Sequence, residues 1–385
     1  MKNIDEIIHL NLGNKGGAWI AANRINTMLI ENGLNSRIVS LRKNPKIIKR
    51  DLPGWIDFKI ERLSPVEYTT SFFRSMAINE NSIDKAIQDA TIINLHWLPG
   101  HIRRSVWDRI KRKKIVWTLH DMQPFTAFCH HSNFCELYIK DCSRCPQALT
   151  WERPLIASEF MYRKDILEQA DIEIISPSEW LAEKVSKSLI FQGKKVHTIP
   201  NPIDAKLIHP SKNVGKNEIL RIGILGSNYG AYKGSNRTLS FIKSIPNDIK
   251  SRIELRILGD VHEDMENFRR SSIEIGSSIT EVLSFMDEID LFLYLSDFEN
   301  LPNLLIELQA KGIPVAAMPV GGVSETFLNG QSGWEIHTPE DFIEILKMVQ
   351  LDPAVLEKFS RNAYLNAREK FSFERILPEY LRVYG

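Results

Sequence analysis

The sequence predicts an α/β protein built from two Rossmann-like domains, and three observations point to this fold. The chain has 385 residues, enough for two domains that each bury a core of their own. A strand that runs into a glycine loop and then a helix occurs twice, first near residue 7 and again near residue 219. Short apolar strands alternate with helical patterns along most of the chain, which is typical of parallel sheets. Hydrophobic residues at 43% and charged residues at 25% indicate a soluble globular protein.

The first half opens with a strand at Ile7 to Leu12, followed by a glycine loop that contains Gly16 and Gly17 and by a helix that ends at Gly33. The loop reads G-N-K-G-G, which is neither G-x-G-x-x-G nor a P-loop. Dinucleotide binding and P-loop chemistry are therefore poorly supported at this position.

Two later strands of the same half end in a histidine. The strands cover Thr91 to Leu98 and Lys114 to Met122, and they place His96 and His120 at the carboxyl end of an apolar run. In a parallel sheet this end is the edge where ligands bind. A lone histidine at such a point is often structural. With two at one edge, and Asp121 after one of them, an active-site role is favoured for His120, whereas a structural role stays favoured for His96.

All four cysteines lie within 17 residues, in the spacing C-x5-C-x6-C-x2-C. Four thiolates satisfy a closed tetrahedral zinc site, so we expect a structural zinc ion here. Two other interpretations stay open, namely reduced buried cysteines and redox chemistry, and a neighbouring histidine is able to replace one ligand. The residues concerned are Cys129, Cys135, Cys142, Cys145, His130 and His131.

Farther along, Ile172 to Val185 reads as a strand and a helix with Ser178 as its N-cap. The polar stretch Ser211 to Glu218 has the composition of a linker. The second half then begins with a strand at Ile219 to Ser227, and Lys233 stands where the next helix opens. A lysine beside a glycine loop and a helix start suits phosphate binding, whereas the alternative is a solvated surface lysine.

The stretch from Asp297 to Glu325 carries the most specific pattern of the chain. Glu299 and Glu307 are separated by seven residues, after a strand at Asp290 to Leu295 and across the start of a helix that ends at Gly312. A carboxylate one turn inside that helix is able to bind the diol of a ribose.

Proline suits the first position of a helix, so Pro302 predicts a helix start whose next backbone amides, those of Asn303 and Leu304, face an anion such as a phosphate. After the following strand, Gly321 and Gly322 supply a loop whose backbone can approach a ligand closely. The alternative for this whole segment is an ordinary βαβ unit with solvated glutamates.

These motifs resemble the retaining glycosyltransferases of family 4, which have the GT-B fold. The family pattern E-G-F-G-x-x-x-x-E-A, G-x-P-V and V-G-G is matched here by E-N-L-P-N-L-L-I-E-L, G-I-P-V and V-G-G. The first glycine loop, the segment T-L-H-D and the cysteine cluster are also similar, the last to a subgroup that assembles bacterial surface polysaccharides. The family has an arginine where this chain has Ser227.

The resemblance implies two Rossmann-like domains that face each other across a cleft. It assigns residues 1–205 to an acceptor-binding domain and 206–371 to a donor domain, with a last helix at 372–385 that packs back on the first. It also implies a UDP- or GDP-sugar as donor and a saccharide or undecaprenyl-linked saccharide as acceptor. No metal ion is expected in catalysis, because no D-x-D motif follows a strand.

The resemblance further gives each site residue a role. The donor diphosphate is expected between Gly16 and Gly17 on one side and the amides of Asn303 and Leu304 on the other, with Lys233 neutralising its charge. Glu299 is expected to bind sugar hydroxyls, and His120 to lie near the transferred sugar. Two alternatives stay open: a sugar-nucleotide epimerase of GT-B fold and a non-catalytic GT-B scaffold.

Charge is unevenly distributed along the chain. Residues 1–200 hold 29 Lys and Arg against 22 Asp and Glu, and the remainder holds 20 against 26, so the halves carry +7 and −6. Much of the excess lies in Arg42 to Arg50, in Arg103 and Arg104, and in Lys111 to Lys114. These clusters are either solvated faces or a docking surface for anionic lipid, and no motif suggests nucleic acid. With no signal peptide or spanning segment apparent, we expect a cytoplasmic protein, in peripheral contact with the membrane if the docking surface is real.

Overall fold

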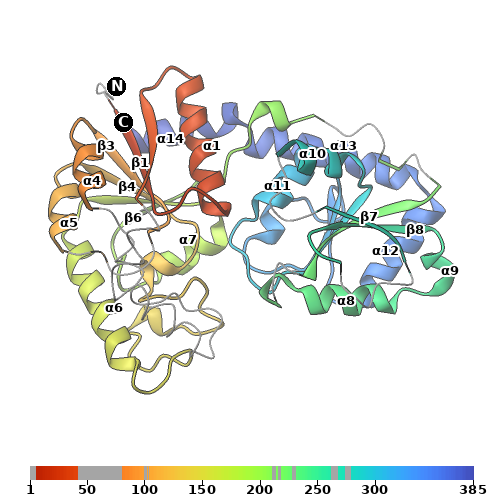
Figure 1. The fold of residues 1–385 in the computed structure, drawn as a ribbon, viewed down its shortest axis with the longest axis horizontal. Helices are drawn as coiled ribbons and strands as arrows, with labels where there is room; N and C mark the ends of the chain where they lie inside the picture. The colour runs from red at the N-terminus through yellow and green to blue at the C-terminus, as the bar shows by residue number, and fades with distance from the viewer. Residues whose placement is uncertain are drawn as a thin grey trace. The chain divides into compact units, whose positions relative to one another are not determined.

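The computed structural model describes residues 6–41, 80–98, 102, 104–209, 214–215, 218–227, 231–261, 268–273 and 279–385. The chain folds as two units (Figure 1). The first comprises Met1–Asn201 together with Leu377–Gly385, and the second comprises Pro202–Ile376. The basic stretch Arg42 to Arg50 and Arg103 lie outside the described residues.

The first unit is organised around a sheet of six parallel strands in the order β2-β1-β3-β4-β5-β6. The strands are β1 (Ile7–Asn11), β2 (Ser36–Ser40), β3 (Ile92–Leu95), β4 (Lys114–Thr118), β5 (Ile172–Ser176) and β6 (Lys195–Thr198). The inner strands read as nearly continuous apolar runs because helices cover both faces of a parallel sheet.

Helices connect these strands. They are α1 (Gly17–Glu31), α4 (Glu80–Ile87), α5 (Arg104–Ile110), α6 (Arg153–Glu168) and α7 (Glu179–Ser186). The N-cap of α7 is Ser178, as predicted, and its hydroxyl accepts a hydrogen bond from the amide of Leu181 at 3.1 Å. Helix α1 ends at Glu31, and Gly33 follows with a left-handed backbone, φ 80°.

The last residues of the chain pack on the sheet of the first unit. They belong to α14 (Phe373–Tyr384), which contains Pro378. The hydroxyl of Tyr384 accepts a hydrogen bond from the side-chain amide of Asn94 at 2.7 Å, and the Tyr384 carbonyl accepts one from Lys114 Nζ at 3.2 Å. Because Tyr384 is only 3% exposed, these bonds fix the chain end against β3 and β4.

The second unit also contains six parallel strands, in the order β12-β11-β10-β7-β8-β9. They are β7 (Leu220–Leu225), β8 (Ile253–Leu258), β9 (Arg269–Ile273), β10 (Leu291–Tyr294), β11 (Val315–Ala317) and β12 (Gly333–Glu335). The helices are α8 (Ser235–Ser244), α9 (Asn247–Lys250), α10 (Ile279–Asp287), α11 (Asn303–Ala310), α12 (Pro339–Leu351) and α13 (Ala354–Phe371).

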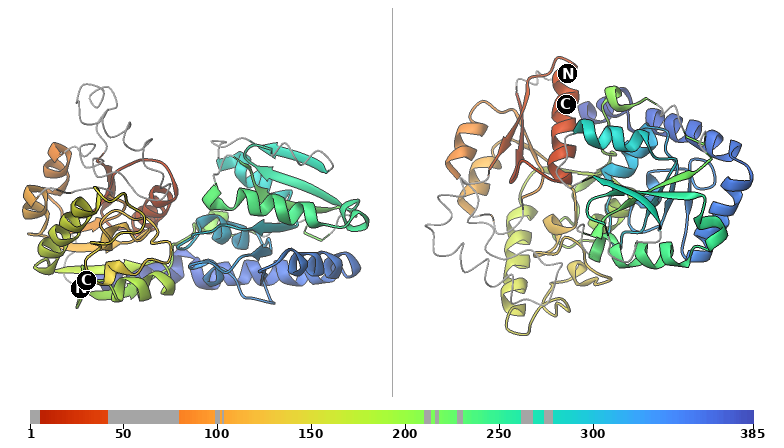
Figure 2. Two further views of the ribbon diagram at one scale, coloured as in Figure 1. Left: turned by 90° about the horizontal axis from the view of Figure 1, so that it is seen from below. Right: turned by 45° about the vertical axis from the view of Figure 1, so that its right-hand side comes forward.

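Alternate residues of the strands build two separate cores on the two faces of this sheet. In β10 and just after it, Leu291, Leu293 and Leu295 pack with residues of α8 and α12, whereas Phe292 and Tyr294 pack with residues of α10 and α11. The views in Figures 1 and 2 agree, with α8 and α12 on one side of the sheet and α10 and α11 on the other. This alternation follows from the two-residue period of a strand.

Both sheets reverse their strand order at one point. In the first unit the chain goes from β1 outward to β2 and returns to β3 on the other side of β1, and in the second it goes from β7 to β8 and β9 and returns to β10. Ligands of open α/β sheets bind outside the carboxyl ends of the strands at such a switch point. The sheets therefore position one candidate half-site at β1 and β3 and another at β7 and β10.

Candidate functional site

The switch point of the second unit is flanked by a lysine and a glutamate that form an ion pair. Lys233 ends a short 3₁₀ turn after β7, and Glu299 lies between β10 and α11. Lys233 Nζ donates to Glu299 Oε1, with side-chain exposures of 24% and 10%. The two residues were predicted separately, for phosphate and for sugar hydroxyls, and the structure brings them into direct contact.

A third group completes this pair. The Tyr294 hydroxyl, at the end of β10, donates a hydrogen bond to the same Oε1 atom of Glu299. Burial, and then the charge of Glu299, raise the pKa of Tyr294 well above its usual value, so the phenol stays protonated and continues to donate. Glu299 is thereby held in one orientation by a lysine and a tyrosine.

Two glycines allow the loops around Glu299 to pack closely. Gly321 has φ 58°, and a Cβ atom placed on it would lie 1.7 Å from the carbonyl oxygen of Glu299. Gly234 has φ 75°, and its Cβ would lie 1.8 Å from the carbonyl oxygen of Leu295. Only glycine fits at these positions. The close approach predicted for Gly321 is thus made to the protein's own backbone, and the neighbouring Gly322 is buried.

Helix α11 presents one partly exposed face. Within Asn303–Ala310, the residues that are not buried are Asn303, Leu304 and Glu307, which share a face by their helical spacing. The prediction that Pro302 occupies the first helical position was wrong by one residue. Its ψ of 118° is extended, so Pro302 is the N-cap and the helix begins at Asn303.

Ser227, which stands where the resembled family has an arginine, is hydrogen-bonded to the backbone of the protein. Ser227 donates its amide to the carbonyl of Asp260 at 2.9 Å. Arg237, on α8, forms an ion pair with Asp297 at 2.5 Å and donates to the Leu295 carbonyl at 3.2 Å. Arg237 therefore stabilises the segment that carries Glu299.

In the first unit, the glycine loop leads directly into α1. Gly16 is the N-cap with φ 86° and ψ 174°, and no atom lies within 4 Å of a Cβ placed on it. Gly17 is the first residue of the helix. The backbone of Gly16 therefore requires glycine for its conformation, whereas the space beside it is open.

Three histidines form a hydrogen-bonded chain across the switch point of the first sheet. His9 Nδ1 lies 2.8 Å from His96 Nε2, and His96 Nδ1 lies 3.0 Å from His120 Nε2. The rings are stacked in order, with centroids 5.1 and 5.2 Å apart. His9 and His96 are buried, whereas His120 is half-buried.

Burial keeps this chain neutral. It lowers the pKa of His9 to about 3 and that of His120 to about 4, and it lowers the pKa of His96 well below its usual value, to which the two neighbouring imidazoles add. The sequence predicted a shared edge for His96 and His120, and the structure places them in contact.

Asp121, next to His120, forms a separate cluster. Its carboxylate accepts hydrogen bonds from Trp97 Nε1 at 3.2 Å, from the Gln123 amide at 2.9 Å, and from His130 Nδ1. Burial alone would raise the pKa of Asp121, but His130 and the Gln123 amide lower it below its usual value. Asp121 remains a carboxylate that anchors the loop after β4.

The structure does not support the predicted zinc site. Among the described residues, no group of three or more His, Cys, Asp or Glu side chains is placed to hold a metal ion. The thiols of Cys129 and Cys145 are hydrogen-bonded to each other, whereas Cys135 and Cys142 bond to the backbone of Leu137 and Ala127. All four cysteines are free thiols.

Several described residues of the basic clusters form ion pairs within the first unit. Lys111 forms an ion pair with Asp108 at 2.6 Å, and Lys114 forms one with Glu173 at 3.4 Å. Arg104 is paired with Asp165. None of the described helices is both long and apolar enough to cross a membrane.

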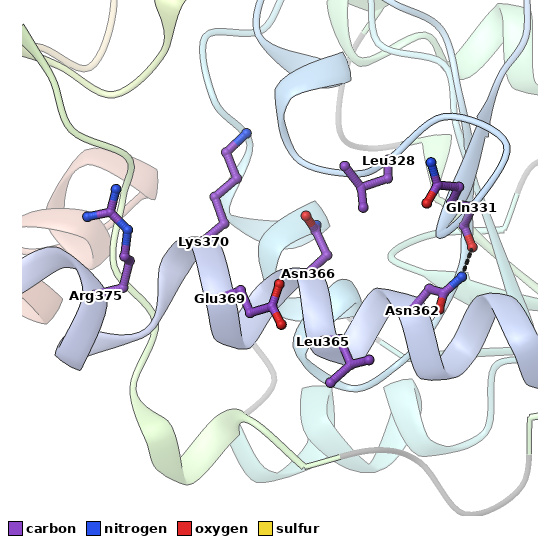
Figure 3. A pocket seen from close by; sticks show the side chains of 8 residues that line it. All are labelled: Leu328, Gln331, Asn362, Leu365, Asn366, Glu369, Lys370 and Arg375. Carbon is purple, nitrogen blue, oxygen red and sulfur yellow. Dashed lines mark hydrogen bonds between the residues drawn. The ribbon is translucent and has the colours of Figure 1, made fainter.

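A separate open cavity of about 480 Å³ lies along α13 in the second unit (Figure 3). Its wall is formed by Leu328, Gln331, Asn362, Leu365, Asn366, Glu369, Lys370 and Arg375. Asn362 donates to the Gln331 carbonyl at 3.0 Å across this wall. None of the site residues predicted from sequence lines it.

Sequence reasoning missed two residues of these half-sites. His9 lies within β1 and reads as one polar residue in an apolar strand, and Tyr294 reads as the last core residue of β10. The one available signal was a histidine in the middle of a buried strand, because such a side chain requires a polar partner.

Comparisons with known proteins agree with this geometry. Residues 220–350 match the family model of glycosyl transferases group 1. The putative colanic acid biosynthesis glycosyl transferase WcaC of Escherichia coli K12 is 21% identical over 424 residues, covering 96% of both chains. The Vi polysaccharide biosynthesis protein VipC/TviE of Salmonella typhi is 32% identical over 114 residues, which is 28% of this chain and 18% of that protein.

The fold is also that of a solved structure, Anabaena HepE in complex with UDP-glucose, with a TM-score of 0.60, 13% identity and 98% of both chains covered. The predicted α/β fold with two Rossmann-like sheets is thereby confirmed. Residues 220–350 are a glycosyl transferases group 1 domain, and the chain has the two-sheet architecture of GT-B glycosyltransferases.

Proposed function

We propose that this chain transfers a sugar, with retention of anomeric configuration, from a UDP- or GDP-sugar to a saccharide or lipid-linked saccharide of a bacterial surface polysaccharide. The observation that carries the proposal is the Lys233–Glu299 pair at the switch point of the second sheet, inside the matched glycosyl transferase domain. The relatives named for colanic acid and Vi polysaccharide synthesis support the product class, and the UDP-glucose complex of HepE supports the donor class.

The chemistry of the second half-site suits a nucleoside diphosphate sugar. Lys233 supplies a cation at Glu299, which precedes α11 in the chain. At the first turn of α11, backbone amides and the helix dipole stabilise an anion. Glu307, on the same face of α11, accepts hydrogen bonds from the ribose hydroxyls. As the sugar–phosphate bond breaks, preorganised donors of this kind stabilise the departing diphosphate.

In the first unit, we assign the open space beside Gly16, together with the adjacent Gly17, to the diphosphate and His120 to the transferred sugar. Glu299 binds sugar hydroxyls and does not act as a nucleophile. The acceptor hydroxyl therefore attacks on the face that the diphosphate leaves, and a phosphate oxygen of the departing diphosphate takes the hydroxyl proton as the sugar–phosphate bond breaks. Proton nuclear magnetic resonance of the product tests this step. An anomeric coupling constant of the configuration opposite to that of the donor contradicts retention.

Donor binding is measured by thermal unfolding against a panel of UDP- and GDP-sugars. A ligand at a hundred times its Kd adds about 2.7 kcal/mol to the unfolding free energy, which gives a clear rise in Tm. Absence of any rise with every sugar nucleotide contradicts the proposal. A new sugar nucleotide formed from donor alone, without acceptor, indicates an epimerase instead.

Two substitutions with matched controls test the assigned residues. Glu307→Ala removes a charged hydrogen bond and should weaken donor binding by about 1 to 3 kcal/mol, whereas Glu344→Ala, an exposed carboxylate on α12, should leave it unchanged. Lys233→Ala should lower kcat, and Lys347→Ala, an exposed lysine on α12, should not. Equal kinetics for a site variant and its control exclude that residue from the site.

A lipid-linked acceptor brings the enzyme to a membrane surface, and the positive charge of residues 1–200 favours anionic lipid there. Flotation with liposomes of anionic and neutral lipid, at low and high salt, measures this contact. Binding that is absent, or that is independent of salt and lipid charge, contradicts it.

A further inference from the structure

The histidine chain of the first unit has two ends with different surroundings. At the inner end, His9 Nε2 is buried and makes no hydrogen bond. At the outer end, the nitrogen that does not bond to His96 is His120 Nδ1, on a half-buried ring that makes further interactions. The remaining four ring nitrogens are used in the two bonds that join the rings.

The number of protons in this chain decides its direction. Each neutral imidazole carries one N–H, so three rings carry three protons, of which two lie within the two hydrogen bonds. The third proton belongs either to His9 Nε2 or to His120 Nδ1. On His9 Nε2 it would be a buried N–H without an acceptor, and such orphaned donors are rare in native proteins.

We propose that His9 and His96 act as positioning residues that fix His120 in its Nδ1–H tautomer. In this arrangement His9 Nδ1 donates to His96 Nε2, and His96 Nδ1 donates to His120 Nε2. Each bond polarises the next in the same direction, which strengthens the chain. His120 then presents an N–H group at the carboxyl end of β4.

This tautomer determines how His120 interacts with a ligand. The role toward the ligand rests on the proposed function, in which His120 lies near the transferred sugar. An Nδ1–H group donates to an oxygen of the ligand, and it accepts no proton there unless all three tautomers reverse. His120 is therefore a hydrogen-bond donor that orients the sugar, and it is not the general base of the transfer.

The first test needs no ligand. Long-range ¹H–¹⁵N correlation of the histidine rings in the full-length protein at neutral pH distinguishes the two tautomers and the imidazolium, with assignment by single substitution of each ring. We expect the Nδ1–H form for His9, His96 and His120, although free imidazole side chains favour Nε2–H. An Nε2–H tautomer or an imidazolium at His120 overturns the proposal, whether or not a donor binds.

The second test separates positioning from mere stability. In His96→Asn the amide retains an N–H that is able to donate to His120 Nε2, whereas His96→Leu has none. We expect His120 to keep its Nδ1–H signal in His96→Asn and to revert to Nε2–H in His96→Leu, with KM for the sugar nucleotide roughly tenfold higher only in the latter. Equal tautomer signals in the two variants refute the positioning role. Failure of the donor to bind the wild-type protein refutes the proposed function and leaves the tautomer result standing.

Discussion

Acid should destabilise the first unit through His9, and the size of the effect follows from its burial. The side chain is 0% exposed, and burial lowers its pKa from 6.5 to about 3. Below pH 6.5, His9 is protonated in the unfolded chain but stays neutral in the folded chain. The folded state therefore loses stability as the pH falls from 6.5 toward 3. Above pH 6.5 neither state is protonated, and the contribution is constant.

The expected magnitude at pH 5 is about 2 kcal/mol. At this pH an unfolded histidine is 1.5 pH units below its pKa and almost fully protonated, whereas His9 in the folded state is still neutral. Each pH unit of difference corresponds to about 1.4 kcal/mol, which gives about 2 kcal/mol between pH 8 and pH 5. His120, with a pKa lowered to about 4, adds a similar loss.

The measurement is urea unfolding at pH 8 and pH 5, followed by tryptophan fluorescence. Seven of the eight tryptophans lie in residues 1–201, so the signal comes mainly from the first unit. The variant His9→Asn cannot titrate, and its loss of stability between the two pH values should be smaller than that of the wild type by about 2 kcal/mol. This double difference cancels every group that both proteins share. Equal losses in the two proteins refute the reasoning, because His9 would then titrate alike in both states.

Two further predictions concern local structure. Ser178→Ala should lower the unfolding free energy by about 1 kcal/mol, because α7 loses its N-cap. Ser186→Ala, at the exposed end of the same helix, should have little effect. If Ser178→Ala lowers the unfolding free energy no more than Ser186→Ala does, the capping role is contradicted. Gly321→Ala and Gly330→Ala both place alanine at positive φ, which costs about 1 to 2 kcal/mol. In urea unfolding, Gly321→Ala should lower the unfolding free energy clearly more than Gly330→Ala, because only the Cβ at position 321 meets the Glu299 carbonyl. Gly321→Ala should also weaken donor binding. Similar losses of unfolding free energy in the two variants contradict this packing.

Local sequence signals predicted the elements of the fold well. The strand that ends before Ser178 and the hydroxyl that caps α7 are encoded within a few residues, and both are confirmed. Gly312 likewise ends α11, with φ 68° and its amide bonded to the Gln309 carbonyl at 2.9 Å. The start of the same helix was misplaced by one residue, since proline fixes φ but leaves ψ open, and Pro302 takes an extended ψ.

Contacts between distant segments were beyond the reach of such signals. Lys233 and Glu299 are separated by 66 positions, and His9 and His96 by 87, so their pairing depends on which strands become neighbours in the sheet. For the cysteines, closeness in the sequence was misleading. Their short spacing favoured a single zinc site, but the loop directs Cys135 and Cys142 to backbone partners.

The Lys233–Glu299 pair also constrains how an anion binds at the second half-site. An anion that pulled Lys233 away would leave the Glu299 side chain, which is 10% exposed, with the Tyr294 hydroxyl but without its cation. Breaking a buried ion pair in this way costs about 3 to 5 kcal/mol. An ammonium group has three N–H donors, so Lys233 is able to bind a phosphate oxygen while it keeps Glu299. Glu299 then orients the lysine toward the anion, and the two residues act as one unit.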